Sequence, residues 1–169
     1  MIASALKKLF SPAPAQTAAH NLYVQIVSQA RQPVFYKDWQ VEDSIDGRFD
    51  IIVLHLFLIV SRFGEENPDF IRVLSEVFFS DMDRSLREMG ASDTGVGIRV
   101  KKMAQAFYGR LKAYGDTIDN TSQLMEALRH NVYREQPVSA ETLQALAAYV
   151  QKNHRQLQAQ SLENIFFSS

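Results

Sequence analysis

Residues 51–60 form the longest apolar run of the sequence, and His55 is the only polar side chain within it. Asp43 or Ser44 precedes the run as a potential helix N-cap. A helix that is apolar on every side must be surrounded by other elements. The run is much shorter than the roughly 18 to 20 apolar residues that cross a bilayer. We therefore predict an all-α fold, a single compact domain of about six to seven helices around a central hydrophobic helix at about residues 47–63.

The other predicted helices are bounded by capping residues, prolines and glycines. A proline cannot continue a helix, whereas serine, threonine, aspartate and asparagine cap helix N-termini. The predicted helices cover residues 15–32 before Pro33, 68–89 between Asn67 and Gly90, a segment opened by Asp93 or Thr94, one from Thr121 or Ser122 to before Pro137, and one from Ser139 to about Gln158. Two of them carry apolar stripes at helical spacing: Ile71, Leu74, Phe78, Met82, Leu86 and Met89, then Val96, Val100, Met103, Phe107, Leu111 and Tyr114.

A length of 169 residues and a hydrophobic content of 46% predict one globular domain. Residues 1–14 are expected to form a flexible or amphipathic N-terminal arm, because Ile2, Leu6 and Leu9 share a helical face before a Ser-Pro-Ala-Pro segment. Such an arm either packs loosely as a chain end or touches a membrane. Residues 15–169 are expected to be the helical domain. The start of the chain lacks the apolar core of a secretory signal and the arginines of a mitochondrial presequence.

Charge is distributed unevenly along the chain, although its net charge is only −1. Residues 81–112 hold seven basic and four acidic side chains, a local net charge of +3. Lys101, Tyr108 and Lys112 are spaced by seven and four positions, so a helix places them on one line opposite the apolar stripe. This basic ridge is either a solvated helix face or a surface that binds phosphate, anionic lipid headgroups or an acidic partner.

Asp81 and Asp83 invite comparison with paired carboxylates that hold magnesium. Residues two positions apart on a helix diverge by roughly 200°, so these carboxylates cannot converge on one ion. The spacings of Asp81 to Arg84, Asp83 to Arg87 and Arg84 to Glu88 instead predict a lattice of ion pairs. Each exposed pair is expected to contribute only about 0.3 to 0.5 kcal/mol, so partner recognition is a further explanation of the pattern.

The sequence contains no motif typical of a catalytic or metal site. Cysteine is absent, no two histidines have metal-ligand spacing, and glycine-rich phosphate loops and serine hydrolase signatures are missing. We therefore predict no catalytic residues, no bound metal and no cofactor.

Several single side chains allow more specific predictions. His55, among aliphatic residues, is expected to be a hydrogen-bonded core residue. Arg110 borders an apolar stripe, where a guanidinium is expected to pair with a carboxylate inside the fold or at an interface. Phe35, Tyr36 and Trp39 follow a proline and either clamp the central helix or form an apolar patch for a hydrophobic client.

Three blocks of sequence resemble the ubiquinol-cytochrome c chaperone family. The blocks are residues 30–36, 46–57 and 81–114, and the third contains Leu-Arg-Glu-Met-Gly, Val-Lys-Lys-Met and Phe-Tyr-Gly-Arg-Leu-Lys-Ala-Tyr in the order of the family. The resemblance implies an all-helical, non-enzymatic chaperone domain that binds newly made cytochrome b during biogenesis of the ubiquinol-cytochrome c reductase. It further implies a bacterial member in the cytoplasm, peripheral to the inner face of the cytoplasmic membrane, with a small partner protein or the ribosome as further partners and no DNA.

Combining the charge pattern with the resemblance gives a set of candidate partner-binding residues. They are Arg31, Phe35, Tyr36, Arg48, Asp83, Arg84, Arg87, Lys101, Lys102, Tyr108 and Lys112. Two other classes of function stay open at this point. One is a nucleic-acid or ribosome-binding module that uses the basic helix at residues 99–112. The other is a magnesium-dependent helical enzyme of the isoprenoid type that uses Asp81 and Asp83.

Overall fold

The structure is a computed structural model that describes residues 12–169, and all regular structure in this part of the chain is helical. The α-helices are α2 (Pro12–Ala30), α3 (Ile45–Phe63), α4 (Pro68–Glu88), α5 (Asp93–Thr117), α6 (Thr121–Asn131) and α7 (Ala140–Leu157). Two short elements accompany them, the π-helical turn η1 (Val34–Asp38) and the 3-10 turn η2 (Leu162–Asn164). The prediction of an all-α single domain is confirmed.

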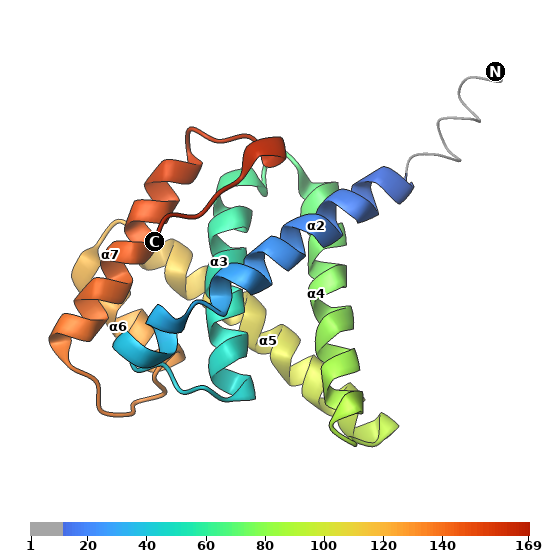
Figure 1. Ribbon diagram of the computed structural model, residues 1–169, viewed down its shortest axis with the longest axis horizontal. Helices are drawn as coiled ribbons and strands as arrows, with labels where there is room; N and C mark the ends of the chain where they lie inside the picture. The colour runs from blue at the N-terminus through green and yellow to red at the C-terminus, as the bar shows by residue number, and fades with distance from the viewer. Residues whose placement is uncertain (1–11) are drawn as a thin grey trace.

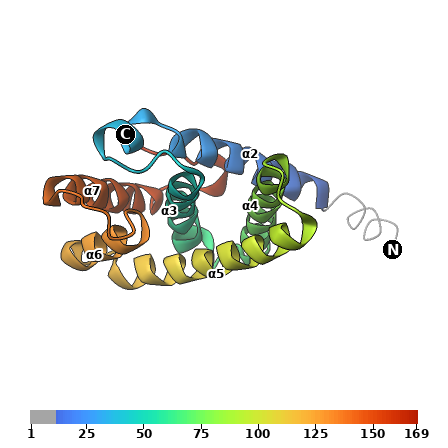
Figure 2. The same cartoon turned by 90° about the horizontal axis from the view of Figure 1, so that it is seen from below.

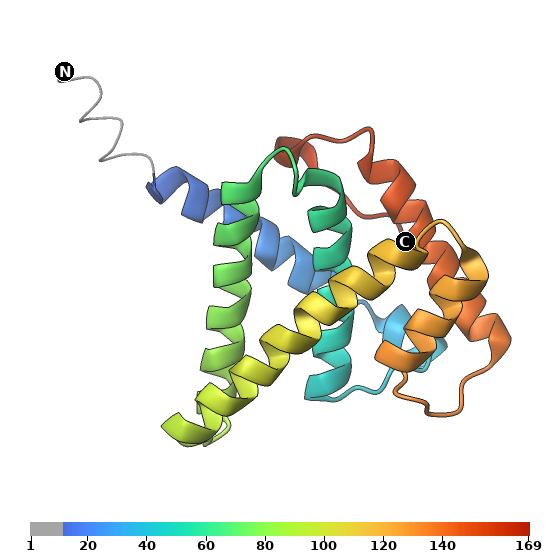
Figure 3. The ribbon, with the colours of Figure 1, turned by 180° about the vertical axis from the view of Figure 1, so that it is seen from behind.

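The central position belongs to α3. In Figure 1, α2 crosses in front of α3 and α4. Figure 3, which is the view from the opposite side, shows α5 running from the lower end of α4 across α3. Figure 2 accordingly places α2 and α5 on opposite sides of α3 and α4. The other flank of α3 packs against α7, and α6 contacts both α5 and α7. The core therefore surrounds α3, as the apolar run at residues 51–60 predicted.

Local sequence explains where α3 begins. Ser44 is the N-cap, and its hydroxyl accepts a hydrogen bond from the Gly47 amide at 3.1 Å. A Cβ atom on Gly47 would lie 1.9 Å from the carbonyl oxygen of Glu42, so only glycine fits this close approach. From Phe49 to Ile59 every residue of the helix is buried.

The predicted ends of the other helices are mostly confirmed. Pro68 starts α4, and Gly90, with φ of 87°, follows its end in the left-handed conformation that favours glycine. Asp93 starts α5, with Ser92 as the N-cap. The first helix is different, since α2 ends at Ala30 rather than at residue 32 and the chain then forms η1.

Met89 corrects one prediction about the core. The spacing of the α4 stripe placed Met89 inside, but its side chain is 50% exposed. The reason is that Met89 is the C-cap residue, with φ of −82° and ψ of 2°, so the chain has left the helix that would have directed it to the core.

The predicted N-terminal arm, residues 1–14, lies outside the described residues apart from residues 12–14, which belong to α2. Of the helices in the described part of the chain, none combines the length and the apolar character needed to cross a membrane.

Candidate partner-binding surface

Phe35 anchors the aromatic connector in the core. It is fully buried, and its ring makes edge contacts with Trp39 and Tyr149, each with centroids 5.3 Å apart, and with His55 at 5.6 Å. Tyr36 is half-buried, and its hydroxyl donates to the carbonyl oxygen of Ala30 at 2.8 Å. Of the two interpretations of this segment, the clamp on the central helix is therefore correct for Phe35, which presents no surface to a partner in this structure.

The acidic and basic side chains of α4 form the predicted lattice. Asp83 pairs with Arg87 at 2.7 Å, Arg84 lies 4.0 Å from Glu88, and Arg84 also pairs with Asp81. The structure adds two contacts that sequence spacing does not reveal. Arg87 also reaches Asp93 across the turn to α5, and the hydroxyl of Tyr23 donates to Asp81 at 2.8 Å.

The two carboxylates proposed for a magnesium enzyme are thus held by different arginines. Asp81 is bound by Arg84 and by a tyrosine of α2, whereas Asp83 faces Arg87. No group of three or more histidines and carboxylates within residues 12–169 has a geometry suited to a metal ion. The alternative of an isoprenoid-type enzyme gains no support from this arrangement.

The basic ridge lies on the outward face of α5, which follows an outer edge of the molecule (Figure 2). Lys101, Lys102, Tyr108 and Lys112 are all exposed. Lys112 pairs with Asp116 at 2.6 Å, whereas Lys101 and Lys102 make no ion pair with any described residue. Lys101 of the ridge and its neighbour Lys102 therefore carry positive charge that no described residue compensates by an ion pair.

Two large apolar side chains accompany these lysines. Tyr108 is 59% exposed, although its ring touches those of Phe79 and Phe107. Ile98 is 54% exposed and precedes Lys101 and Lys102 by three and four positions, which places it on the same face. Ile98 was not among the residues predicted from the sequence, although the predicted apolar stripe of this helix already left it outside the core.

The remaining candidates lie apart from the ridge. Arg48 pairs with Asp43 at 2.8 Å beside the start of α3. Arg31, at the end of α2, is exposed, and both arginines act electrostatically on the hydroxyl of Tyr36. The predicted residues thus form two clusters. One is the α4–α5 surface, defined by Asp83, Arg84, Arg87, Lys101, Lys102, Tyr108 and Lys112, and the other is the group Arg31, Tyr36 and Arg48.

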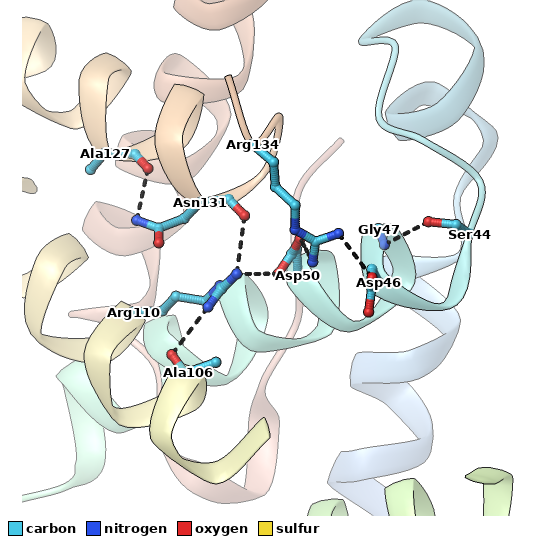
Figure 4. Close-up of polar contacts among 9 residues, drawn as sticks. All are labelled: Ser44, Asp46, Gly47, Asp50, Ala106, Arg110, Ala127, Asn131 and Arg134. Carbon is cyan, nitrogen blue, oxygen red and sulfur yellow. Dashed lines mark hydrogen bonds and ion pairs between the residues drawn. The ribbon is translucent and has the colours of Figure 1, made fainter. Parts of the chain in front are cut away.

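A buried ion-pair network was only half predicted from the sequence (Figure 4). Arg110 pairs with Asp50 at 2.9 Å, which confirms the expected carboxylate partner. Arg134 approaches the same carboxylate at 2.8 Å and Asp46 at 3.3 Å. Asp50 is fully buried, and burial raises its pKa to about 7 although both guanidinium groups oppose the shift. The network connects the start of α3 to α5 and to the segment that follows α6.

His55 is the hydrogen-bonded core residue that the sequence predicted. Its Nδ1 lies 2.8 Å from the carbonyl oxygen of Ile51, which can only accept, so Nδ1 carries the proton and donates. Its Nε2 therefore accepts from the hydroxyl of Tyr149 at 2.7 Å. That hydroxyl accepts in turn from Gln29 at 3.1 Å. The chain of hydrogen bonds fixes α2, α3 and α7 relative to one another, and burial lowers the pKa of His55 to about 4.

Replacing His55 with asparagine should make the stability of the protein less sensitive to acid. The folded-state pKa lies below the ordinary value of about 6.5, so the unfolded chain takes up the proton first as the pH falls. This group stabilises the fold fully above the ordinary value, and between about pH 7 and about pH 5 the wild-type protein should lose about 2 kcal/mol through it. Urea unfolding of both proteins at the two pH values measures the difference. If the wild-type protein and the His55→Asn variant lost the same stability between the two pH values, the lowered pKa of His55 would be contradicted.

Comparisons with known proteins point to one group of relatives. The family model described as ubiquinol-cytochrome C chaperone matches residues 37–168. The crystal structure of the Cbp3 homolog from Brucella abortus superposes with a TM-score of 0.83 at 33% sequence identity, covering 100% of this chain and 97% of that one. The mouse ubiquinol-cytochrome c reductase complex assembly factor 1 is 21% identical over 155 residues, 89% of this chain and 52% of the mouse protein. The chain therefore spans about half the length of that curated relative.

Proposed function

Because the chain belongs to the ubiquinol-cytochrome c chaperone family, we propose that it is a non-enzymatic assembly chaperone that binds newly made cytochrome b during biogenesis of the ubiquinol-cytochrome c reductase. The likeness to the Brucella abortus protein over the whole chain is the observation that carries this proposal. The name of the mouse relative, an assembly factor of the same complex, supports it.

We place the client contact on the α4–α5 surface. Lys101 and Lys102 are exposed and lack ion-pair partners among the described residues, so their charge is available to acidic segments of a client. Tyr108 and Ile98 add apolar area beside that charge. The same combination suits the headgroup region of a membrane, which supports a location peripheral to the inner face of the cytoplasmic membrane. A small partner protein or the ribosome would compete for the same charges.

Reversing the charges of Lys101 and Lys102 together should impair cytochrome b biogenesis while leaving the fold intact. Both side chains point away from the core, and surface changes of this kind usually alter stability by under about 0.5 kcal/mol. The readouts are the amount of cytochrome b in membranes, from its haem absorption, and its co-purification with the tagged chaperone. Both are expected to fall in the Lys101→Glu, Lys102→Glu variant.

A matched control carries the same change of charge elsewhere on the surface. Lys37 and Arg155 are exposed and make no ion pair within the described chain, and they lie on η1 and α7 rather than on the α4–α5 surface. Lys37→Glu with Arg155→Glu should leave cytochrome b at the wild-type amount. A normal amount of cytochrome b in the lysine variant, at normal abundance of the chaperone, would show that the client does not depend on Lys101 and Lys102.

A further inference from the structure

A groove of about 840 Å³ is lined by residues of α2 and α4. These two helices pack against each other and cross in Figure 1. One face of each helix lines the groove, from Gln16 to Arg31 on α2 and from Val73 to Arg84 on α4. At the helical rise of 1.5 Å per residue, the α2 face extends about 22 Å. The α2 wall lies outside the stretch that matches the family model, residues 37–168. The groove borders the α4–α5 surface at Arg84, but its α2 wall contributes nothing to that surface.

The floor of the groove is apolar. Val24 and Val27 of α2 lie opposite Val73 and Val77 of α4, and the valines are three positions apart on α2 and four apart on α4. Val24 is 53% exposed, and the other three valines are only partly buried against the core. No residue in the described part of the chain covers this strip, so it remains available to an apolar face brought by another molecule.

The charges around the groove leave one cation unmatched. Glu76 is held by Arg72 at 2.7 Å, and Asp81 is held by Arg84 and by the hydroxyl of Tyr23. Arg31 makes no ion pair with any residue from 12 to 169. It acts electrostatically on the Tyr23 hydroxyl, so it lies at the same end of the groove as Asp81. An occupant that complements the groove therefore brings a carboxylate to that end.

The shape of the groove favours a helix over an extended peptide. Its two walls are helices, whose backbone groups are already bonded within each helix, so they offer no edge to which a strand could add. A helix satisfies its own backbone and presents apolar side chains at spacings of three, four and seven, which fits two pairs of valines. A length of about 11 to 15 residues would follow the lined face of α2.

We infer that the groove binds a helical segment of the client polypeptide, with an apolar stripe against the four valines and a carboxylate against Arg31. The inference rests on the proposed chaperone function, because it takes the client to be cytochrome b. It adds a second contact with different chemistry, since the α4–α5 surface offers mainly charge whereas the groove offers apolar area with a single unpaired cation. The two contacts meet at Arg84 and otherwise involve different residues, so one client chain could occupy both.

Peptide binding tests the inference directly. Fluorescein-labelled peptides of about 15 residues, tiling the cytochrome b of the same organism, are titrated with the full-length chaperone and followed by fluorescence anisotropy. We expect binding by peptides that combine a helical apolar stripe with an acidic residue near one end. Val24→Glu and Arg31→Glu should each weaken this binding about tenfold or more. Changing the acidic residue of the peptide to lysine should restore binding to the Arg31→Glu protein.

Two matched controls lie away from both contacts. Phe166, in the segment after η2, is 57% exposed and so resembles Val24, and Arg155 of α7, like Arg31, is exposed without an ion-pair partner among the described residues. Phe166→Glu and Arg155→Glu should leave peptide affinity unchanged. Peptide binding that the groove variants leave unchanged would overturn the inference, as would the absence of any binding peptide.

Two further measurements distinguish other possible occupants of the groove. A wild-type dimer that dissociates on Val24→Glu, measured by sedimentation, would assign the groove to a second copy of the chain. Peptide binding that tightens about tenfold when Leu6 and Leu9 are changed to glutamate would assign it to the first residues of the same chain. Either result overturns the inference.

Co-purification distinguishes failure of the inference from failure of the proposed function. If the groove variants still co-purify cytochrome b in full, the groove assignment fails and the proposed function stands. If the wild-type protein co-purifies none, the proposed function itself fails.

Discussion

Leu54→Ala and Phe57→Ala should each lower the free energy of unfolding by about 2 to 5 kcal/mol. Both side chains lie in the middle of α3 with at most 2% of their surface exposed. The Phe57 ring packs against Tyr114 of α5 and is stacked over His154 of α7, so its loss opens a cavity between three helices. Neighbouring elements cannot close such a cavity fully because each is fixed by its own contacts.

Thermal unfolding measures the effect. For a chain of this size, each kcal/mol corresponds to a shift in Tm of roughly 2 to 4 °C. Val24→Ala, at an exposed position of α2, is the control and should change Tm by no more than about 2 °C. A shift of less than about one degree for both core variants would refute the central role of α3.

The fold was largely predictable because its signals are local. Proline, glycine and capping residues mark the helix ends, and the continuous apolar run of α3 has no stable place except the centre. The errors lie where helical geometry stops. Met89 is the clearest case, because periodicity cannot show that the residue before Gly90 has already left the helix. The π-helical turn at Val34–Asp38 likewise depends on how Phe35 fits between α3 and α7.

The candidate surfaces were predictable only where they lie on one helix. The lattice of α4 and the ridge of α5 follow from spacing alone, and the structure confirms both arrangements. The groove between α2 and α4 could not be predicted, since it depends on how two helices distant in sequence cross. Asp50 was missed for the same reason. Asp50 directly precedes the apolar run. Arg110 was expected to pair with a carboxylate, but the sequence does not indicate that this carboxylate is Asp50.

The Asp50 network leads to the second large effect. Arg110→Met should lower the free energy of unfolding by about 3 to 5 kcal/mol at about pH 8, because it leaves a fully buried carboxylate with Arg134 as its remaining close cation. Methionine keeps much of the apolar volume of the arginine stem, so the loss reports the charge more than the packing. Arg72→Met, which breaks the exposed pair with Glu76, is the control and should cost under about 1 kcal/mol.

The effect of Arg110→Met should shrink in acid. Burial raises the pKa of Asp50 above its ordinary value, so the folded protein is most stable with respect to this group below about pH 4 and loses that stability as the pH rises through about 7. Arg110 is the largest influence that opposes the shift, and its removal raises the pKa of Asp50 further. At about pH 5 the carboxyl is then protonated in both proteins, and the missing guanidinium matters less. Guanidinium chloride unfolding at the two pH values measures the change.

A double variant separates charge from packing. Asp50→Asn with Arg110→Met removes both members of the pair, and the remaining cation, Arg134, is partly exposed and keeps Asp46 as a partner. Because no uncompensated carboxylate is left inside, the double variant should be more stable at about pH 8 than Arg110→Met alone. The interaction energy from the double-mutant cycle is expected to be about 1 to 3 kcal/mol. Additive losses, equal at both pH values, would mean that Arg110 stabilises the protein through its contacts with Phe49 and the carbonyl groups of Ala106 and Asn131 rather than through Asp50.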